Sequence, residues 1–133
     1  MSASLHVSIC IVGFHNHEEI AGCVAALAQL TYTDFDIAIC ENGGTASWEK
    51  LKAALPATLP GGQAVECINA GSNLGYAGGV NTAMRARPDS GAWWVVNPDT
   101  LPEPDALSAL VERLSRGDCH MVGGVLYNAA GRV

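Results

Sequence analysis

Short apolar runs alternate with amphipathic segments along the whole chain. The apolar runs are rich in branched and bulky residues and predict β-strands at residues 6–12, 36–40, 64–68, 93–96 and 121–126. Between them, apolar residues recur at helical spacing and predict helices at residues 17–30, 46–55, 78–86 and 105–116. Asn16 is a suitable N-cap for the first helix, and Glu18 and Glu19 suit its positive end. Strict alternation of strands and helices predicts a three-layer α/β/α fold with a mostly parallel sheet.

The stretch from residue 92 to residue 100 has the clearest functional meaning. Four bulky residues, including Trp93 and Trp94, predict a buried strand whose tryptophans pack under helices on both faces. Pro98 ends this strand, because proline cannot donate to a sheet ladder, and Asp99 follows it. In an open α/β sheet, ligands bind at the carboxyl ends of the strands. Asp99, with the amide carbonyl of Asn97 two residues earlier, is therefore a candidate site for a hard divalent cation, Mn²⁺ or Mg²⁺.

Composition narrows the possible ligands. The chain has 133 residues, which favours a single domain, and 49% of them are hydrophobic, which suits a buried parallel sheet. Its formal net charge is -6 with seven Lys and Arg together, which argues against binding to nucleic acid or to an acidic membrane surface. An acidic protein that binds phosphates needs a metal ion or backbone amides to neutralise them.

The cysteines and the chain ends suggest no secretion and no membrane span. None of the five cysteines forms a C-x-x-C pair or has zinc-ligand spacing, so we expect small buried side chains in a reducing compartment. No basic residue precedes the first apolar run, and no stretch of about 20 apolar residues is present. We expect a cytoplasmic protein, with the inner face of the membrane as the alternative location.

Four polar or glycine-rich segments directly follow predicted strands, at residues 13–16, 41–44, 69–79 and 97–100. In a parallel sheet these segments meet at one edge and together form a suitable nucleotide site. The dinucleotide signature G-x-G-x-x-G is absent after the first strand, where Gly13 stands alone, and no G-x-x-x-x-G-K-[ST] phosphate loop is present. Simpler interpretations remain: Asp99 as the cap of a turn, and Glu41 as an exposed turn residue.

Four segments resemble glycosyltransferase family 2 in order and spacing, and are most similar to its rhamnosyltransferase-like members. They are residues 7–16 (VSICIVGFHN), 41–43 (ENG), 73–81 (NLGYAGGVN) and 96–100 (VNPDT). The first segment alone is weak, whereas the third followed by the fourth is specific. The resemblance covers nearly the whole chain and implies a GT-A fold that binds a nucleotide-diphosphate sugar, with dTDP-rhamnose or a UDP-sugar as the donor.

The resemblance also implies roles for individual residues. The residues carried over to the nucleotide site are Val12, Gly13, Phe14, Glu41, Asn42, Asn73, Gly75 and Asn97. Asp99 matches the second position of the family's D-x-D motif and is the expected metal ligand. Asn97 replaces the first acidic residue of that motif, as is common in this subgroup.

One expected part is missing from the sequence. In this family the catalytic base and most of the acceptor site come from a later segment, so the base is expected beyond residue 133. We therefore interpret residues 1–133 as the donor-binding part of a truncated, inverting glycosyltransferase domain with a saccharide or lipid-linked acceptor, which by itself binds the donor only. A non-catalytic α/β nucleotide-binding or interaction module is the alternative. A nucleotidyltransferase is less suitable, because residues 13–16 do not form a basic phosphate loop.

Overall fold

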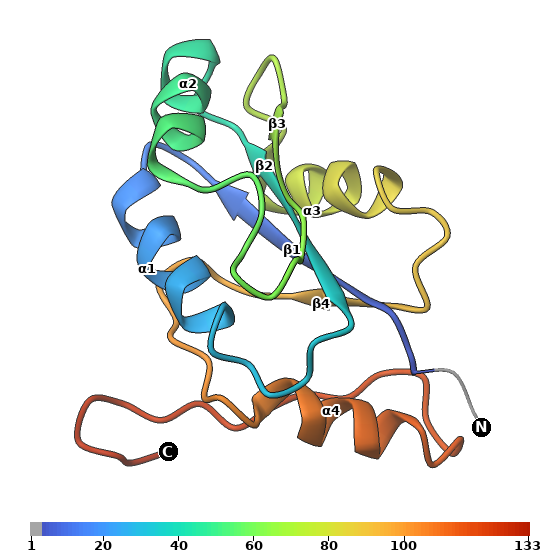
Figure 1. Ribbon diagram of the computed structural model, residues 1–133. Helices are drawn as coiled ribbons and strands as arrows, with labels where there is room; N and C mark the ends of the chain where they lie inside the picture. Colours follow the sequence, from blue (N-terminus) through green and yellow to red (C-terminus); the bar gives the residue numbers. More distant parts are fainter. Residues whose placement is uncertain (1–3) are drawn as a thin grey trace.

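The computed structural model describes residues 4–133 and contains one parallel sheet with helices on both faces (Figure 1). The strands are β1 (Val7–Gly13), β2 (Phe35–Glu41), β3 (Val65–Asn69) and β4 (Ala92–Val95). The helices are α1 (His17–Leu27), α2 (Thr45–Ala54), α3 (Gly75–Arg85) and α4 (Ala106–Leu114). The predicted three-layer α/β fold with a mostly parallel sheet is confirmed.

The order of the strands changes direction beside β1. The strand order is β3-β2-β1-β4, and all three neighbouring pairs are parallel. The chain moves outward from β1 to β3, and then α3 leads it back to β4 on the other side of β1. The connections therefore diverge at the carboxyl ends of β1 and β4, which is the topological switch point where α/β sheets bind ligands.

The two faces of the sheet differ in the size of their side chains. One face forms the main core with α1, α2 and α4, including Ile9, Leu27, Leu51 and Leu107. The other face carries small residues such as Ala38, and there α3 packs against β1 and β2. In Figure 1, α1 and α2 lie on the opposite side of the sheet from α3. Small side chains on this face let α3 approach the sheet closely.

The predicted strand at residues 121–126 is wrong. The structure shows no strand there, and its apolar side chains are exposed, with Met121 at 89% and Leu126 at 75%. Gly123 and Gly124 interrupt the run, and glycine in a strand has a high entropic cost. The turn expected after this run is present, because the amide of Gly131 donates to the carbonyl of Asn128 at 2.9 Å.

The prediction of a strand buried on both faces is also wrong for β4. Trp94 packs against the main core, but Trp93 is 37% and Val95 41% exposed on the other face. The reason is that α3 lies over β1 and β2, so it leaves this face of β4 uncovered.

Charged side chains connect the amino-terminal ends of three strands. Arg87, just after α3, donates from Nε to Asp36 at 2.8 Å and from Nη2 to Glu66 at 3.0 Å. Nδ1 of His6 lies 2.7 Å from a carboxylate oxygen of Asp34. The hydrogen bond to Asp34 raises the pKa of His6 above its usual value of 6.5, although burial opposes this effect.

This network predicts that the contribution of His6 to stability decreases between mildly acidic and mildly basic pH. A raised pKa in the folded state means that protonated His6 stabilises the fold; this contribution is complete below the unfolded pKa and is lost as the pH rises through the folded pKa. Urea unfolding at pH 5.5 and pH 8.5 should therefore show His6→Gln losing more stability, relative to the unchanged protein, at the lower pH. Asp34→Asn should remove the same pH dependence, and an equal loss at both pH values would contradict this prediction.

Candidate functional site

The segments that follow β1, β2 and β3 are joined at the carboxyl edge of the sheet. The amide of Asn42, just after β2, donates to the carbonyl of Gly13 at 2.8 Å. The amide of Ala70, just after β3, donates to the carbonyl of Glu41 at 3.1 Å. Val96, after β4, continues the ladder to β1. The parallel topology thus brings the predicted segments together at one edge.

The turn after β1 presents an aromatic side chain. Phe14 is 54% exposed and stacks edge-on against His15 with 4.5 Å between the ring centroids. His15 has a φ of 55°, a left-handed conformation that is uncommon for residues other than glycine. Asn16 occupies the expected N-cap position of α1, but its side chain accepts a hydrogen bond from the Phe14 amide at 2.8 Å and makes no cap bond. The side chain therefore shapes the turn rather than the helix.

Glu41 is fully buried, so the interpretation as an exposed turn residue is wrong. One carboxylate oxygen, Oε2, accepts from the Gly43 amide at 2.9 Å, while Oε1 has no partner. A Cβ atom at Gly13, the neighbour of Glu41 in the sheet register, would lie 3.2 Å from Oε1. Glycine at position 13 therefore leaves space beside a buried acceptor, which is costly without a hydrogen-bond donor.

Asn42 connects the end of β2 to the start of α3. Its Nδ2 donates to the carbonyl of Gly75 at 2.9 Å, and its Oδ1 accepts from the Leu74 amide at 3.3 Å. Asn73 accepts from the Gly75 amide at 3.0 Å, and Gly75 has a φ of 74°. The structure thus brings together Asn42, Asn73 and Gly75, but the Asn42 amide group is used within the protein.

The segment after β4 forms a turn in which Asp99 is left available. Both the amide and the hydroxyl of Thr100 donate to the carbonyl of Asn97, at 3.2 and 2.7 Å. The Tyr76 hydroxyl, from α3, donates to Oδ1 of Asn97 at 2.8 Å. Asp99 is exposed, and its carboxylate makes no hydrogen bond or ion pair within residues 4–133. Thr100 therefore closes this turn, and Asp99 does not cap it.

The donor set suits a cation that is shared with a ligand. Within residues 4–133, no three histidine, cysteine or acidic side chains gather as a complete metal site. Magnesium and manganese are often held by one or two carboxylates together with substrate phosphates. The free carboxylate of Asp99 fits this arrangement, whereas Oδ1 of Asn97 already accepts from Tyr76.

The neighbouring cysteine is not a candidate nucleophile. Cys23 is buried beneath the Asn97–Thr100 turn, with its Sγ 3.9 Å from the Asn97 carbonyl oxygen. Burial, together with the nearby Asp99 carboxylate, raises the pKa of Cys23 to about 11. Its thiol is therefore neutral at physiological pH. Cys10 and Cys40 are buried as well, as the sequence predicts, whereas Cys67 and Cys119 are only partly buried, and all five cysteines are free.

Sequence reasoning left two features of this edge undetermined. The hydroxyl of Tyr76, on α3, donates a hydrogen bond to Oδ1 of Asn97 in the turn after β4, a contact that no local sequence pattern marks. The ring of His15 lies where a Cβ atom at Gly43 would come within 3.0 Å of it, so this side chain packs against the turn after β2.

Comparisons with known proteins agree with the fold. The sequence profile of the family described as "Glycosyl transferase family 2" matches residues 8–132. A mannosyltransferase from Pyrobaculum calidifontis, solved with GDP-Man and Mn²⁺, is 16% identical with a TM-score of 0.69 and is matched over 86% of this chain and 33% of its own. TarS 1–349 from S. aureus, solved with UDP-GlcNAc, is 11% identical with a TM-score of 0.68, over 84% of this chain and 32% of its own. No curated protein matches the chain.

The solved structures are much longer than this chain. The chain spans about a third of the length of the solved structures that it resembles, and at these identities the likeness shows the fold alone. None of the helices described within residues 4–133 combines the length and the apolar composition that crossing a bilayer requires.

Proposed function

Because this chain belongs to glycosyltransferase family 2, we propose that it binds a nucleotide-diphosphate sugar and forms the donor-binding part of an inverting glycosyltransferase. The observation that carries this proposal is the position of Asp99, an exposed carboxylate without a partner among the described residues, at the switch point of the sheet. The loops that follow the other three strands begin at this same edge of the sheet. They supply an aromatic face, a buried acceptor and glycine-rich backbone.

We assign one group of residues to the base and ribose of the donor and another group to its diphosphate. Val12, Gly13 and Phe14 line the base pocket, where the exposed ring of Phe14 offers a stacking surface. The unpartnered Oε1 of Glu41 accepts from a donor group of the base or ribose. Asn42 and Asn73 hold the Gly75 turn in place beside the nucleotide.

The diphosphate end depends on the turn after β4. Asp99 holds Mn²⁺ or Mg²⁺, which supplies Lewis-acid neutralisation of the diphosphate leaving group when it is bound. Tyr76 fixes the Asn97 side chain and thereby keeps the turn, and Asp99 with it, in position. A protein with a formal net charge of -6 has a particular need for this neutralisation.

The donor and acceptor follow from the resemblance rather than from geometry. We propose a rhamnosyltransferase-like enzyme that uses dTDP-rhamnose or a UDP-sugar, with a saccharide or lipid-linked acceptor of the kind found in cell-wall or polysaccharide biosynthesis. The similar solved structures contain UDP-GlcNAc and GDP-Man, so the structural likeness accommodates several nucleotides. We further propose action in the cytoplasm, at the inner membrane face if the acceptor is lipid-linked.

A catalytic base for the acceptor is proposed to lie beyond residue 133. At this edge Glu41 is assigned to the base and ribose and Asp99 to the metal, so neither is available to deprotonate an acceptor hydroxyl. Residues 1–133 should therefore bind donor but transfer little sugar. A non-catalytic nucleotide-binding module has the same donor site, and a transfer assay on a protein that includes the downstream segment separates the two.

Calorimetric titration of this chain with dTDP, UDP and GDP, each with and without Mn²⁺, tests the proposal. We expect one nucleotide to bind clearly more tightly than the others, and binding to need the metal. Adenosine diphosphate serves as a control for unspecific diphosphate binding. If a folded chain binds none of the three nucleotides, the donor site assigned here is wrong.

A further inference from the structure

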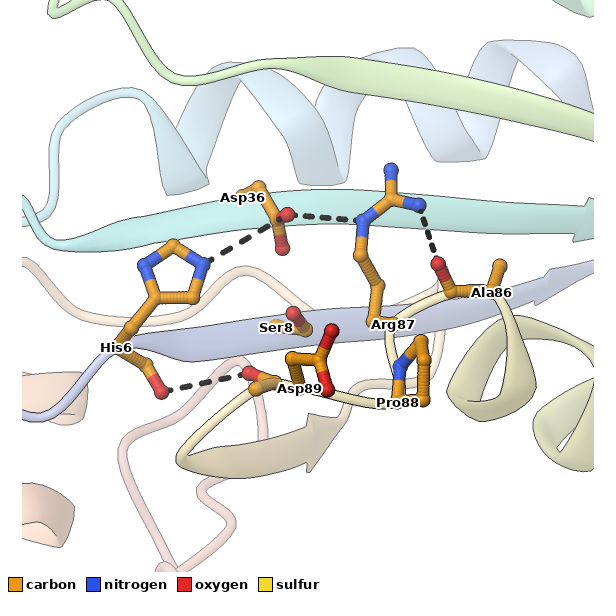
Figure 2. A pocket seen from close by; sticks show the side chains of 8 residues that line it. His6, Ser8, Asp36, Ala86, Arg87, Pro88 and Asp89 are labelled. Carbon is orange, nitrogen blue, oxygen red and sulfur yellow. Dashed lines mark hydrogen bonds and ion pairs between the residues drawn. The ribbon is translucent and has the colours of Figure 1, made fainter.

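A second polar site lies at the opposite edge of the sheet. A pocket of about 260 Å³ opens at the amino-terminal ends of β1 and β2, beside the segment that follows α3 (Figure 2). Its polar lining includes His6, Ser8, Asp36, Arg87 and Asp89. The donor site lies at the carboxyl ends of these strands, so the pocket belongs to a different part of the molecule. Its volume exceeds that of several water molecules.

Two buried polar atoms in this pocket have no partner. Ser8 is 0% exposed, and its Oγ makes no hydrogen bond. Oδ1 of Asp36 is likewise buried and unpartnered. The two residues are paired in the β1–β2 register, so both side chains point to the same face of the sheet. Figure 2 shows both side chains at the pocket. Burying a polar atom without a partner is costly, and a bound ligand would relieve this cost.

The charged donors of the pocket are already used. The three guanidinium nitrogens of Arg87 donate to Asp36, to Glu66 and to the carbonyl of Ala86, at 2.8 to 3.0 Å. Nδ1 of His6 bonds to Asp34, and its Nε2 lies 3.7 Å from Asp36. The Ser8 hydroxyl can both donate and accept, and the free oxygen of Asp36 can only accept, so a ligand with N–H donors satisfies both groups.

The charges around the pocket favour a cation. Asp36 and Asp89 line it, and Asp34 and Glu66 lie directly behind the ion pairs, against Arg87 and His6. Four carboxylates thus lie around this pocket, together with one arginine and one histidine. A divalent metal ion is less suitable, because no group of three metal-binding side chains exists among residues 4–133.

We propose that this pocket binds a primary ammonium group, with the Asp36 carboxylate and the Ser8 hydroxyl as its acceptors. Asp36 supplies both charge and an unpartnered oxygen, while Ser8 supplies a fixed, fully buried oxygen that only a group inside the pocket reaches. A small amine, or the ammonium end of a lysine side chain, presents this chemistry. The proposal is independent of the donor site, because it uses none of the residues assigned there.

Amide chemical shifts of the isotope-labelled chain, titrated with methylammonium chloride at constant ionic strength, test this proposal. We expect saturable shifts with a millimolar dissociation constant, confined to residues 8, 36 and 87–90, since so small a ligand has few atoms to contribute. Nα-acetyl-lysine methylamide is titrated in parallel. Tighter binding of that compound would identify a lysine side chain as the natural source, and weaker binding would identify a free amine.

Two controls keep the result specific. Tetramethylammonium carries the same charge without N–H donors and should bind at least fivefold more weakly. Ser8→Ala removes only the hydroxyl and leaves the ion pairs intact, so it should fold and should also weaken methylammonium binding at least fivefold. Asp36→Asn should weaken it further. Shifts that do not saturate, equal binding of tetramethylammonium, or unchanged binding by folded Ser8→Ala would each overturn the proposal.

Discussion

Replacing Asp99 with alanine is expected to remove the metal dependence of nucleotide binding and to weaken that binding at least tenfold in the presence of Mn²⁺, about 1.4 kcal/mol. The reason is that Asp99 is the only candidate carboxylate ligand exposed on the Asn97–Thr100 turn, while Asn97 is held by Tyr76. Without this ligand, the cation loses its link to the protein, and the negative charge of the diphosphate is no longer neutralised. Isothermal titration with the preferred nucleotide, with and without Mn²⁺, measures the effect.

Matched variants make this result interpretable. Asp99→Asn keeps the size of the side chain and removes its charge, so its loss of metal-dependent affinity should be similar. Glu103→Ala removes another exposed carboxylate four residues later and should leave the affinity unchanged. Nucleotide affinity in Asp99→Ala that equals that of the unchanged protein, with the same response to Mn²⁺, would show that the metal ligand is misassigned.

Hydrophobic periodicity was sufficient to locate the strands of the sheet. It was insufficient to predict whether a run of residues finds a neighbouring strand or a covering helix. The runs that became β1, β2 and β3 were placed to within one or two residues, because their burial is visible in their own composition. Residues 121–126 have a similar apolar composition, yet no strand of the described chain pairs with them. The exposed face of β4 has the same cause, since the position of α3 depends on the packing of the whole sheet.

The candidate site shows the same contrast: its location could be predicted from the sequence, whereas the contacts between its side chains could not. The parallel topology was enough to predict which four segments meet, and these segments do carry Glu41, Asn42 and Asp99. The partner of each side chain could not be predicted, because Asn42 bonds to residues more than 30 positions away and Tyr76 bonds to Asn97. The start of α3 was placed at residue 78 instead of Gly75 for a related reason: the turn that begins it depends on the bonds of Asn42 and Asn73.

The close contact between α3 and β1 predicts opposite effects for two helical glycines. A Cβ atom at Gly79 would lie 2.7 Å from a methyl group of Val12 and 3.2 Å from Nδ2 of Asn42, whereas a Cβ atom at Gly22 in α1 would meet nothing within 4 Å. Val12 is β-branched and lies in a central strand, so it has little freedom to move. Overpacking of this kind typically costs 1–3 kcal/mol, whereas alanine at an unobstructed helical position gains about 1 kcal/mol over glycine.

Gly79→Ala should therefore unfold at a lower temperature than the unchanged protein and Gly22→Ala at a higher one, with a difference of about 5 °C or more between the two variants. Thermal unfolding followed by circular dichroism measures this difference. Gly79→Ala should also bind nucleotide more weakly, because α3 can make room only by moving from Val12 and from the amide of Asn42 that holds Gly75. If Gly79→Ala is as stable as Gly22→Ala, then α3 does not pack this closely on β1. In that case the hydrogen bond from Asn42 to the carbonyl of Gly75 does not depend on close packing of α3.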